Sequence, residues 1–252
     1  MGPITSDTWK ILSSRPIRGA ENDPMRAPSK ALLGLLKLML LEFKDKFPPC
    51  FFGQESTFPV LAGCDDYINR ISKVNLSGEI FTKTTLITAD FGDAYTETSI
   101  PGLQKSISVI GNIFGYGNEY ITLMQKMVKL VFTNCVFYTP TGLYRQTKGM
   151  PMGDFSSRDS LDIVLTRSEL NIINFSRSIP LGIHLFCRLV DDISVLCQGD
   201  FEQVRMLIST MARNYPNMPL NFQISFGYSR FLDLHIYNFV TFFLPTYRLY
   251  HS

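Results

Sequence analysis

Paired cysteines and long apolar runs are both missing from the sequence. Its five cysteines are an odd number without a Cys-x-x-Cys pair, which fits neither a disulfide framework nor a zinc site. The longest apolar run, Ala31 to Leu41, is interrupted by Lys37 and is far shorter than the roughly 20 residues that span a bilayer. The first residues lack the charged and apolar segments of a signal peptide. We therefore expect reduced thiols and an intracellular protein of nucleus or cytoplasm, with no membrane partner.

Charge is also scarce, with a net value of +2 and only 18% charged residues. This balance neither requires nor excludes a polyanionic partner, so the distribution of charge matters more than its sum. The N-terminal stretch is locally basic, which indicates either a nucleic-acid contact or a solvated face; the residues are Lys10, Arg15, Arg18, Arg26 and Lys30. A hydrophobic fraction of 45% over 252 residues is ample for a core.

Apolar periodicity predicts several helices. The first 30 residues contain four prolines and are expected to be extended or looped. Helices are expected from near Ser29 to Phe47, over 65–73, after Pro101-Gly102, over 118–132, after a cap at Asp154 or Ser156, and over 201–213.

Strands are predicted between these helices by alternating and β-branched residues. They are expected over 85–91, 136–138, 143–145, 183–190, 193–196, 221–226 and 231–237. The turn composition of 139–142 joins the second and third strands as a hairpin. Because helices and strands do not alternate strictly, the fold class is α+β, an antiparallel sheet with helices on one face.

Two adjacent aspartates, Asp191 and Asp192, lie at the expected tip of an otherwise apolar hairpin. Like charges this close repel unless a cation lies between them, although Asp-Asp is also ordinary turn chemistry. Asp90 ends another apolar strand and is expected to meet Asp191 on the neighbouring strand. Magnesium prefers carboxylate and phosphate oxygens with water, so three converging carboxylates indicate a two-metal site for nucleotidyl transfer.

Four segments resemble the motifs of reverse transcriptases. Residues 90–95 (DFGDAY) resemble motif A, 146–153 (QTKGMPMG) resemble motif B, 188–192 (RLVDD) resemble motif C, and 231–234 (FLDL) resemble the primer-gripping segment. Their form, with residues 15–17 (RPI) upstream, is most similar to Penelope-like retroelement reverse transcriptases, which are related to telomerase. The resemblance covers roughly residues 9 to 248 and rests on the order and spacing of the four motifs together.

The resemblance implies roles for individual residues. Asp90 and Asp191 would bind two Mg²⁺ ions, or Mn²⁺, with Asp192 as a supporting carboxylate and the Phe91 carbonyl as a further ligand. Tyr95 would lie under the sugar of the incoming nucleotide and exclude a 2′-hydroxyl.

The remaining roles concern the nucleotide and the primer. Gly149 and Gly153 would let backbone approach the nucleotide, and Gln146 and Lys148 would face the same pocket, although a plain turn also suits these glycines. The resemblance further implies triphosphate binding by Arg15 and Arg18, and a primer grip at Phe231, Leu232 and Asp233.

The implied architecture is that of a right-hand polymerase. Residues 1–83 would form partial fingers and connecting helices, 84–238 the palm, and 239–252 the start of a truncated thumb connection. Two departures from the family pattern are Ser156-Ser157, where Ser-Pro is common, and Asp154, which adds a negative charge beside the glycine.

The expected function is RNA-directed DNA polymerisation, with an RNA template, a DNA primer and deoxynucleoside triphosphates as partners. A second hypothesis is an inactive or domesticated domain that only binds nucleic acid. A third is an RNA-dependent RNA polymerase, in which a small or polar residue usually replaces the bulky Tyr95.

Overall fold

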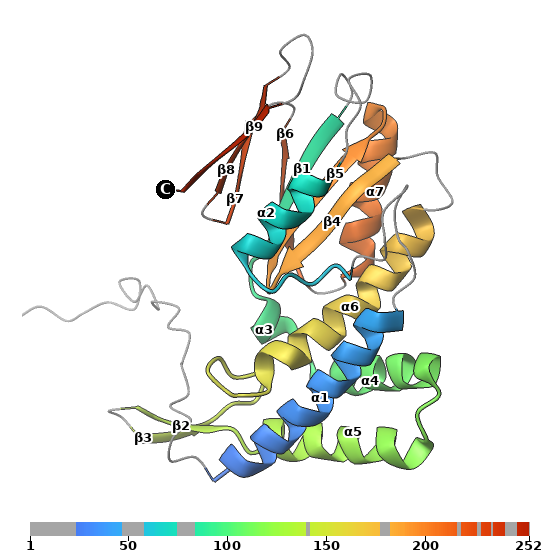
Figure 1. The fold of residues 1–252 in the computed structure, drawn as a ribbon. Helices are drawn as coiled ribbons and strands as arrows, with labels where there is room; N and C mark the ends of the chain where they lie inside the picture. The colour runs from blue at the N-terminus through green and yellow to red at the C-terminus, as the bar shows by residue number, and fades with distance from the viewer. Residues whose placement is uncertain are drawn as a thin grey trace, which may run out of the picture.

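The structure, a computed structural model, describes residues 24–46, 58–74, 84–139, 142–176, 182–215, 218–225, 228–232, 234–239 and 246–251. A sheet region lies beside a layer of helices, and α6 (Ser157–Ser176) runs between the two (Figure 1). No helix of the described residues is long and apolar enough to cross a membrane.

The main sheet has four antiparallel strands in the order β4, β5, β1, β6. Their bounds are Gly182–Leu189 for β4, Asp192–Gln198 for β5, Thr84–Phe91 for β1 and Leu220–Ser225 for β6. In β1 every residue except Asp90 is buried, a pattern typical of a strand covered on both faces. The α+β architecture and the strands expected at these positions are confirmed within one or two residues.

One face of the main sheet packs against helices. Ile87 of β1 and Val195 of β5 point into a core that also contains Leu207 of α7 (Phe201–Asn214). The same core continues through α6 into the helical layer, which consists of α1 (Arg26–Lys46), α4 (Ile100–Phe114) and α5 (Asn118–Thr133). Each fully buried Leu or Ile contributes roughly 1.5–3 kcal/mol, so this continuous core joins the sheet and the helical layer into one folded unit.

The opposite face of the main sheet is covered as well. Leu86 and Leu196 alternate with the residues of the first core and pack against Tyr67 of α2 (Cys64–Lys73) and Phe231. Phe231 belongs to a second sheet of three strands, β7 (Tyr228–Phe231), β8 (Leu234–Phe239) and β9 (Thr246–His251). The expected sheet with helices on one face alone is therefore corrected, because its strands carry apolar residues on both faces.

Three local expectations also differ from the structure. Helix α1 begins at Arg26, before the expected Ser29, because Pro28 falls in the first turn, where its missing N–H costs nothing. A short helix, α3 (Ala94–Glu97), was not expected. The strand predicted over 231–237 is two strands, since Leu232 adopts a left-handed φ of 56° and turns the chain between β7 and β8.

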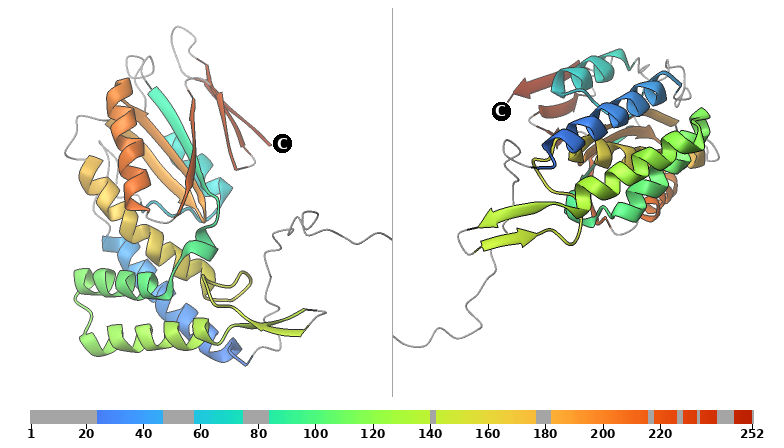
Figure 2. Two further views of the ribbon diagram at one scale, coloured as in Figure 1. Left: turned by 180° about the vertical axis from the view of Figure 1, so that it is seen from behind. Right: turned by 90° about the horizontal axis from the view of Figure 1, so that it is seen from below.

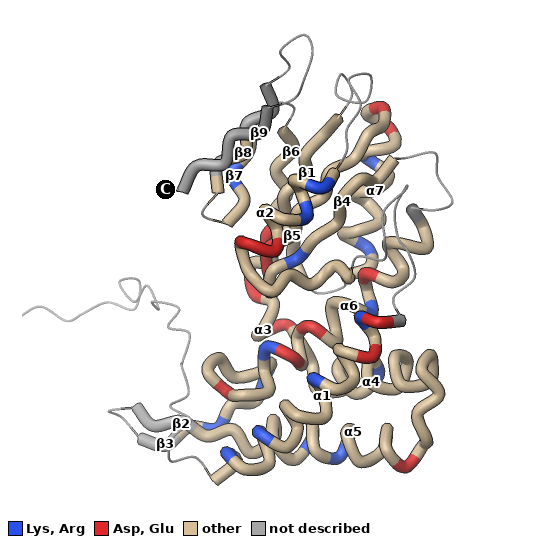
Figure 3. The backbone as a smooth tube through the Cα atoms, viewed as in Figure 1, with Lys and Arg blue, Asp and Glu red and all other residues tan. Residues whose placement is uncertain are grey.

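The hairpin expected around residues 139–142 is confirmed as β2 (Val136–Thr139) and β3 (Gly142–Arg145). It forms a sheet of its own and extends away from the helical layer (Figure 2). Lys and Arg positions are spread over both the sheet region and the helical layer (Figure 3). The domain boundaries stay a prediction, as does the thumb connection, whose residues 246–251 pair with β8.

Candidate active site

The turn between β4 and β5 contains the paired aspartates. Leu189 pairs with Asp192, so the two residues between them, Val190 and Asp191, make the turn. Val190 adopts a left-handed φ of 56°, which is rare for a β-branched residue. The expected tip of Asp191 and Asp192 is therefore shifted by one residue, and Asp192 is the first residue of β5.

Strand register brings Asp90 opposite this turn. Asp90 of β1 is the direct cross-strand partner of Asp192, rather than of Asp191 as the sequence suggested. The backbone N–H of Phe91 donates to the carbonyl of Asp191 at 3.2 Å, which ties the turn to the end of β1. Directly opposed residues have Cβ atoms roughly 4.5–5.5 Å apart, so Asp90 and Asp192 are close like charges. Asp90 and Asp192 therefore lie opposite each other at one end of the two central strands, with Asp191 in the adjoining turn.

Electrostatics reflect this clustering. Burial, followed by repulsion from Asp191 and Asp90, raises the pKa of Asp192 to about 6. A cation between the carboxylates would remove that repulsion. Among the described residues, no group of three or more His, Cys, Asp or Glu side chains is arranged to hold a metal ion by itself. Magnesium is usually held by one or two carboxylates together with water and substrate phosphates. The Asp90 and Asp192 pair, with Asp191 in the adjoining turn, fits that mode of binding.

The loop of residues 146–153 is locked onto α3. Gly149 adopts a φ of +75°, and a Cβ there would lie 2.6 Å from the carbonyl oxygen of Tyr95. The next residue, Met150, donates its backbone N–H to that oxygen at 2.8 Å. Close backbone approach explains why glycine is needed at this position. The contact joins the loop to the segment that follows Asp90.

Tyr95 interacts electrostatically with Asp191. Its side chain is partly buried, and burial followed by the negative charges of Asp162 and Asp191 raises its pKa to about 12. The phenol is therefore neutral at physiological pH, and the negative charge of Asp191 contributes to its raised pKa. That placement agrees with a contact near the reacting nucleotide, although the role itself stays a prediction.

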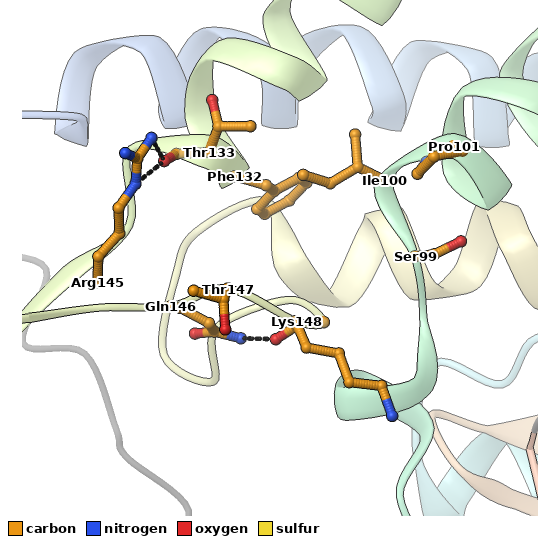
Figure 4. A pocket seen from close by; sticks show the side chains of 10 residues that line it. Ser99, Ile100, Pro101, Phe132, Thr133, Arg145, Gln146, Thr147 and Lys148 are labelled. Atoms are coloured by element: carbon orange, nitrogen blue, oxygen red, sulfur yellow. Dashed lines mark hydrogen bonds between the residues drawn. The ribbon is translucent and has the colours of Figure 1, made fainter.

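A cleft of about 420 Å³ lies between this loop, the start of α4 and the end of α5 (Figure 4). Gln146 lines it and donates its side-chain amide to the Lys148 carbonyl at 2.9 Å. The Lys148 amine points toward α3, where it pairs with Glu97 at 2.6 Å. Both predicted nucleotide-binding side chains thus belong to the cleft wall, and Lys148 is already paired with a carboxylate.

Other predicted site residues are placed differently. Phe91 is buried, with its ring edge-on to Tyr215 at 4.9 Å, so only its backbone can face a metal. Phe231 is buried against Tyr67 at a ring distance of 4.6 Å, which leaves its side chain inside the second core. Leu232 lies at the turn after β7. Arg15, Arg18 and Asp233 lie outside the described residues.

Three charged residues near the turn were not among the predicted site residues, although Arg188 belongs to the segment 188–192 that resembles motif C. Arg188 is fully buried and forms ion pairs with Asp162 and Glu169 of α6. Charged residues on the apolar side of a helix were the available signal, because such residues are almost never buried unless they are paired. Asp162 and Glu169 are seven residues apart, which places them on one helix face.

Known proteins share the fold of this chain, but none of them identifies a family for it. No family model matches the chain, and no curated protein matches it in sequence. Among solved structures, telomerase from Candida albicans with a fragment of telomeric RNA aligns with 82% of this chain at 16% identity, with a TM-score of 0.59. Apo telomerase from Candida tropicalis aligns with 82% at 14% identity, with a TM-score of 0.62.

The RNA-dependent RNA polymerase of a human picobirnavirus aligns with 84% of this chain at 12% identity, with a TM-score of 0.55. This chain spans only 36%, 38% and 39% of the lengths of these three proteins. At such low identity the similarity concerns the fold alone. The chain therefore has the polymerase-type fold that telomerase shares with viral RNA-dependent RNA polymerases.

Proposed function

We propose that this chain is the catalytic core of an RNA-directed DNA polymerase that extends a primer 3′-hydroxyl with deoxynucleotides. The observation that supports this most directly is the register of the main sheet, in which Asp90 is opposite Asp192 and adjoins the turn at Asp191. Clustered carboxylates at the ends of two strands are costly without a cation, and the Mg²⁺ ions that nucleotidyl transfer requires would be such cations.

The carboxylates would hold two Mg²⁺ ions, with Mn²⁺ as a substitute. Bound there, the ions would activate the primer hydroxyl and neutralise the triphosphate and the leaving pyrophosphate. Asp90 and Asp191 are the proposed ligands, and Asp192 supports them from its position opposite Asp90. The Phe91 carbonyl is the proposed additional ligand. The chain itself would mainly orient the substrates and hold the negative charge that binds the metal.

Selection of deoxynucleotides is assigned to Tyr95 in this proposal. A partly buried ring near Asp191 would collide with a 2′-hydroxyl on the incoming sugar. This distinguishes the proposal from RNA polymerisation, the activity named for the similar viral proteins. Gln146, Lys148 and Gly149 would border the nucleotide, and the motif resemblance supports an origin in a Penelope-like retroelement.

Primer extension tests the proposal. The purified chain is given a primed RNA template, deoxynucleoside triphosphates and Mg²⁺, and Asp191→Asn is compared with wild type. We expect loss of at least about 100-fold in rate, since the variant removes a metal ligand while preserving side-chain shape. The matched control is Asp45→Asn, which makes the same substitution at an exposed aspartate near the end of α1 and should retain the wild-type rate.

Three outcomes would redirect the proposal. Equal incorporation by wild type and Asp191→Asn would remove the carboxylates from the mechanism. Faster incorporation of ribonucleotides than deoxynucleotides would favour an RNA polymerase. Tight, salt-sensitive binding of the primed template without any incorporation would favour the second hypothesis, a domain that only binds nucleic acid.

A further inference from the structure

Arg188 lies directly beneath the turn that carries Asp191. Arg188 is the second-last residue of β4, and its side chain is completely buried. Its Nη1 donates to the carbonyl oxygen of Val190 at 2.9 Å, two residues along the chain. The guanidinium therefore contacts the backbone of the turn itself, immediately before Asp191.

Two carboxylates of α6 hold this guanidinium in place. Nη1 also donates to Oδ1 of Asp162 at 2.6 Å, while Nε donates to Oε1 of Glu169. Nη2 lies 3.5 Å from the second oxygen of Glu169, so the two groups face each other as a fork. Helix α6 is itself fixed by the first core, so the guanidinium is braced against a rigid element.

The charge on Arg188 persists despite its burial. Burial alone would lower the pKa of Arg188, but attraction to Glu169 and Asp162 raises it above its ordinary value. Burial raises the pKa of Glu169, and Arg188 only partly offsets this. Buried ion groups of this kind often contribute less to stability than apolar residues of the same volume. Stability alone therefore does not account for this buried group of charges.

The backbone of Arg188 is fixed from the opposite direction. Its N–H donates to the carbonyl of Pro59 at 2.8 Å, and its carbonyl accepts from the N–H of Leu61 at 2.7 Å. The turn that follows contains Val190 in a left-handed conformation, which persists only where its surroundings over-determine it. The guanidinium contact to the Val190 carbonyl is such a restraint.

We propose that Arg188 is a positioning residue, which transmits the rigidity of α6 through Asp162 and Glu169 to the Val190-Asp191 turn and so fixes the Asp191 carboxylate for metal binding. This inference rests on the proposed function, since it assumes that Asp191 is a metal ligand. It gives a role to residues that are not among the proposed metal ligands. Partners that orient metal ligands commonly change metal affinity or activity by roughly 10–100-fold when they are replaced.

Arginine is specifically required by this geometry. Only a planar guanidinium offers Nε to Glu169 while one terminal nitrogen bridges Asp162 and the Val190 carbonyl. A lysine keeps the charge but has a single nitrogen. Arg188→Lys therefore tests the fork and not the charge.

The test measures Mn²⁺ binding to the full chain by electron paramagnetic resonance, with no nucleotide or template present. Arg188→Lys should weaken binding about 10-fold. In primer extension it should raise the Mg²⁺ concentration for half-maximal rate by a similar factor, and lower kcat more than it raises KM for the nucleotide. Asp191→Asn marks the loss of a direct ligand, and Asp162→Asn should shift the same quantities in the same direction by less.

A matched control separates positioning from general loss of stability. Ile107→Ala creates a cavity in α4, in the helical layer, and removes no contact of the turn. The control should melt at lower temperature than wild type and bind Mn²⁺ normally. The inference fails if folded Arg188→Lys binds Mn²⁺ like wild type, or if Ile107→Ala weakens binding equally.

The two proposals can fail separately. Should Arg188→Lys not fold, Asp162→Asn provides the same comparison, and normal Mn²⁺ binding by that folded variant would overturn the inference. Wild-type chain that binds Mn²⁺ no better than Asp191→Asn would overturn the metal site itself, and the inference with it.

Discussion

Replacing Asp192 with asparagine should make the metal-free protein more stable at neutral pH. Asp192 lies directly opposite Asp90 and next to Asp191, at a half-buried position at the start of β5. Asparagine has the same shape and removes one of the like charges. This variant should remove both the cost of burying the Asp192 charge and its repulsion from Asp191 and Asp90, which a bound cation would offset.

The size of the effect follows from the pKa of Asp192. A rise from 3.8 to about 6 corresponds to about 3 kcal/mol at 1.36 kcal/mol for each pKa unit. Because the side chain is only partly buried, solvent screening reduces this to about 1 kcal/mol. For a chain of this length, that gain raises Tm by about 3 °C.

The sign depends on pH. Below the unfolded value of 3.8 the carboxyl is protonated in both states, so the two proteins should have equal stability apart from the substitution itself. As pH rises from there, the folded state retains a proton that the unfolded state releases. Above about 6 the wild type carries the full cost of burying the charge and of its repulsion from Asp191 and Asp90, and the gain from Asp192→Asn reaches its maximum.

Urea denaturation at pH 7 and pH 4, with chelator and then with Mg²⁺, measures these differences. Mg²⁺ should stabilise wild type more than the variant, because a ligand that binds only the folded state adds RT ln(1 + [L]/Kd). Asp45→Asn, an exposed carboxylate on α1, is the control and should change stability by less than about 0.5 kcal/mol. A variant less stable than wild type at pH 7 without metal would refute the electrostatic reasoning.

Three further predictions concern nearby contacts. Gly149→Ala should destabilise the fold by about 1–3 kcal/mol, measured by urea denaturation, because its Cβ would lie 2.6 Å from both the Tyr95 carbonyl oxygen and the Thr96 Cα. Tyr67→Phe should cost about 1 kcal/mol in the same assay, since it removes the buried 2.9 Å hydrogen bond to the Ser194 hydroxyl. Tyr95→Ala should increase ribonucleotide incorporation at least 10-fold relative to deoxynucleotides in competitive primer extension, through loss of about 1.4 kcal/mol or more of discrimination.

Each of these predictions has its own opposing result. A Gly149→Ala variant as stable as wild type would show that α3 can move away from the loop. Ser194→Ala is the reciprocal variant of Tyr67→Phe. Unchanged stability of Tyr67→Phe would mean that the two hydroxyls gain no more from each other in the folded state than they gain from water in the unfolded state. Tyr95→Phe, which keeps the ring, is the control for Tyr95→Ala and should still exclude ribonucleotides.

Local features of this fold could be predicted because they depend on neighbouring residues. Alternating and β-branched residues identified the strands of the main sheet, and turn composition identified the β2–β3 hairpin. The apolar hairpin around Asp191 and the strand ending near Asp90 were likewise evident. These patterns are set by backbone preference and by the two-residue and 3.6-residue periods of strands and helices.

Tertiary structure alone decided which charges meet. Pairing register made Asp192 the partner of Asp90, and a one-residue shift in a strand is invisible to composition. Burial of Arg188 with Asp162 and Glu169 likewise required α6 to pack on β4, since these residues are far apart in sequence. The sequence by itself therefore determined the strands, the helices and the presence of two aspartates at the turn of an otherwise apolar hairpin. Packing determined the geometry of the carboxylates, because that geometry arises from contacts between distant segments.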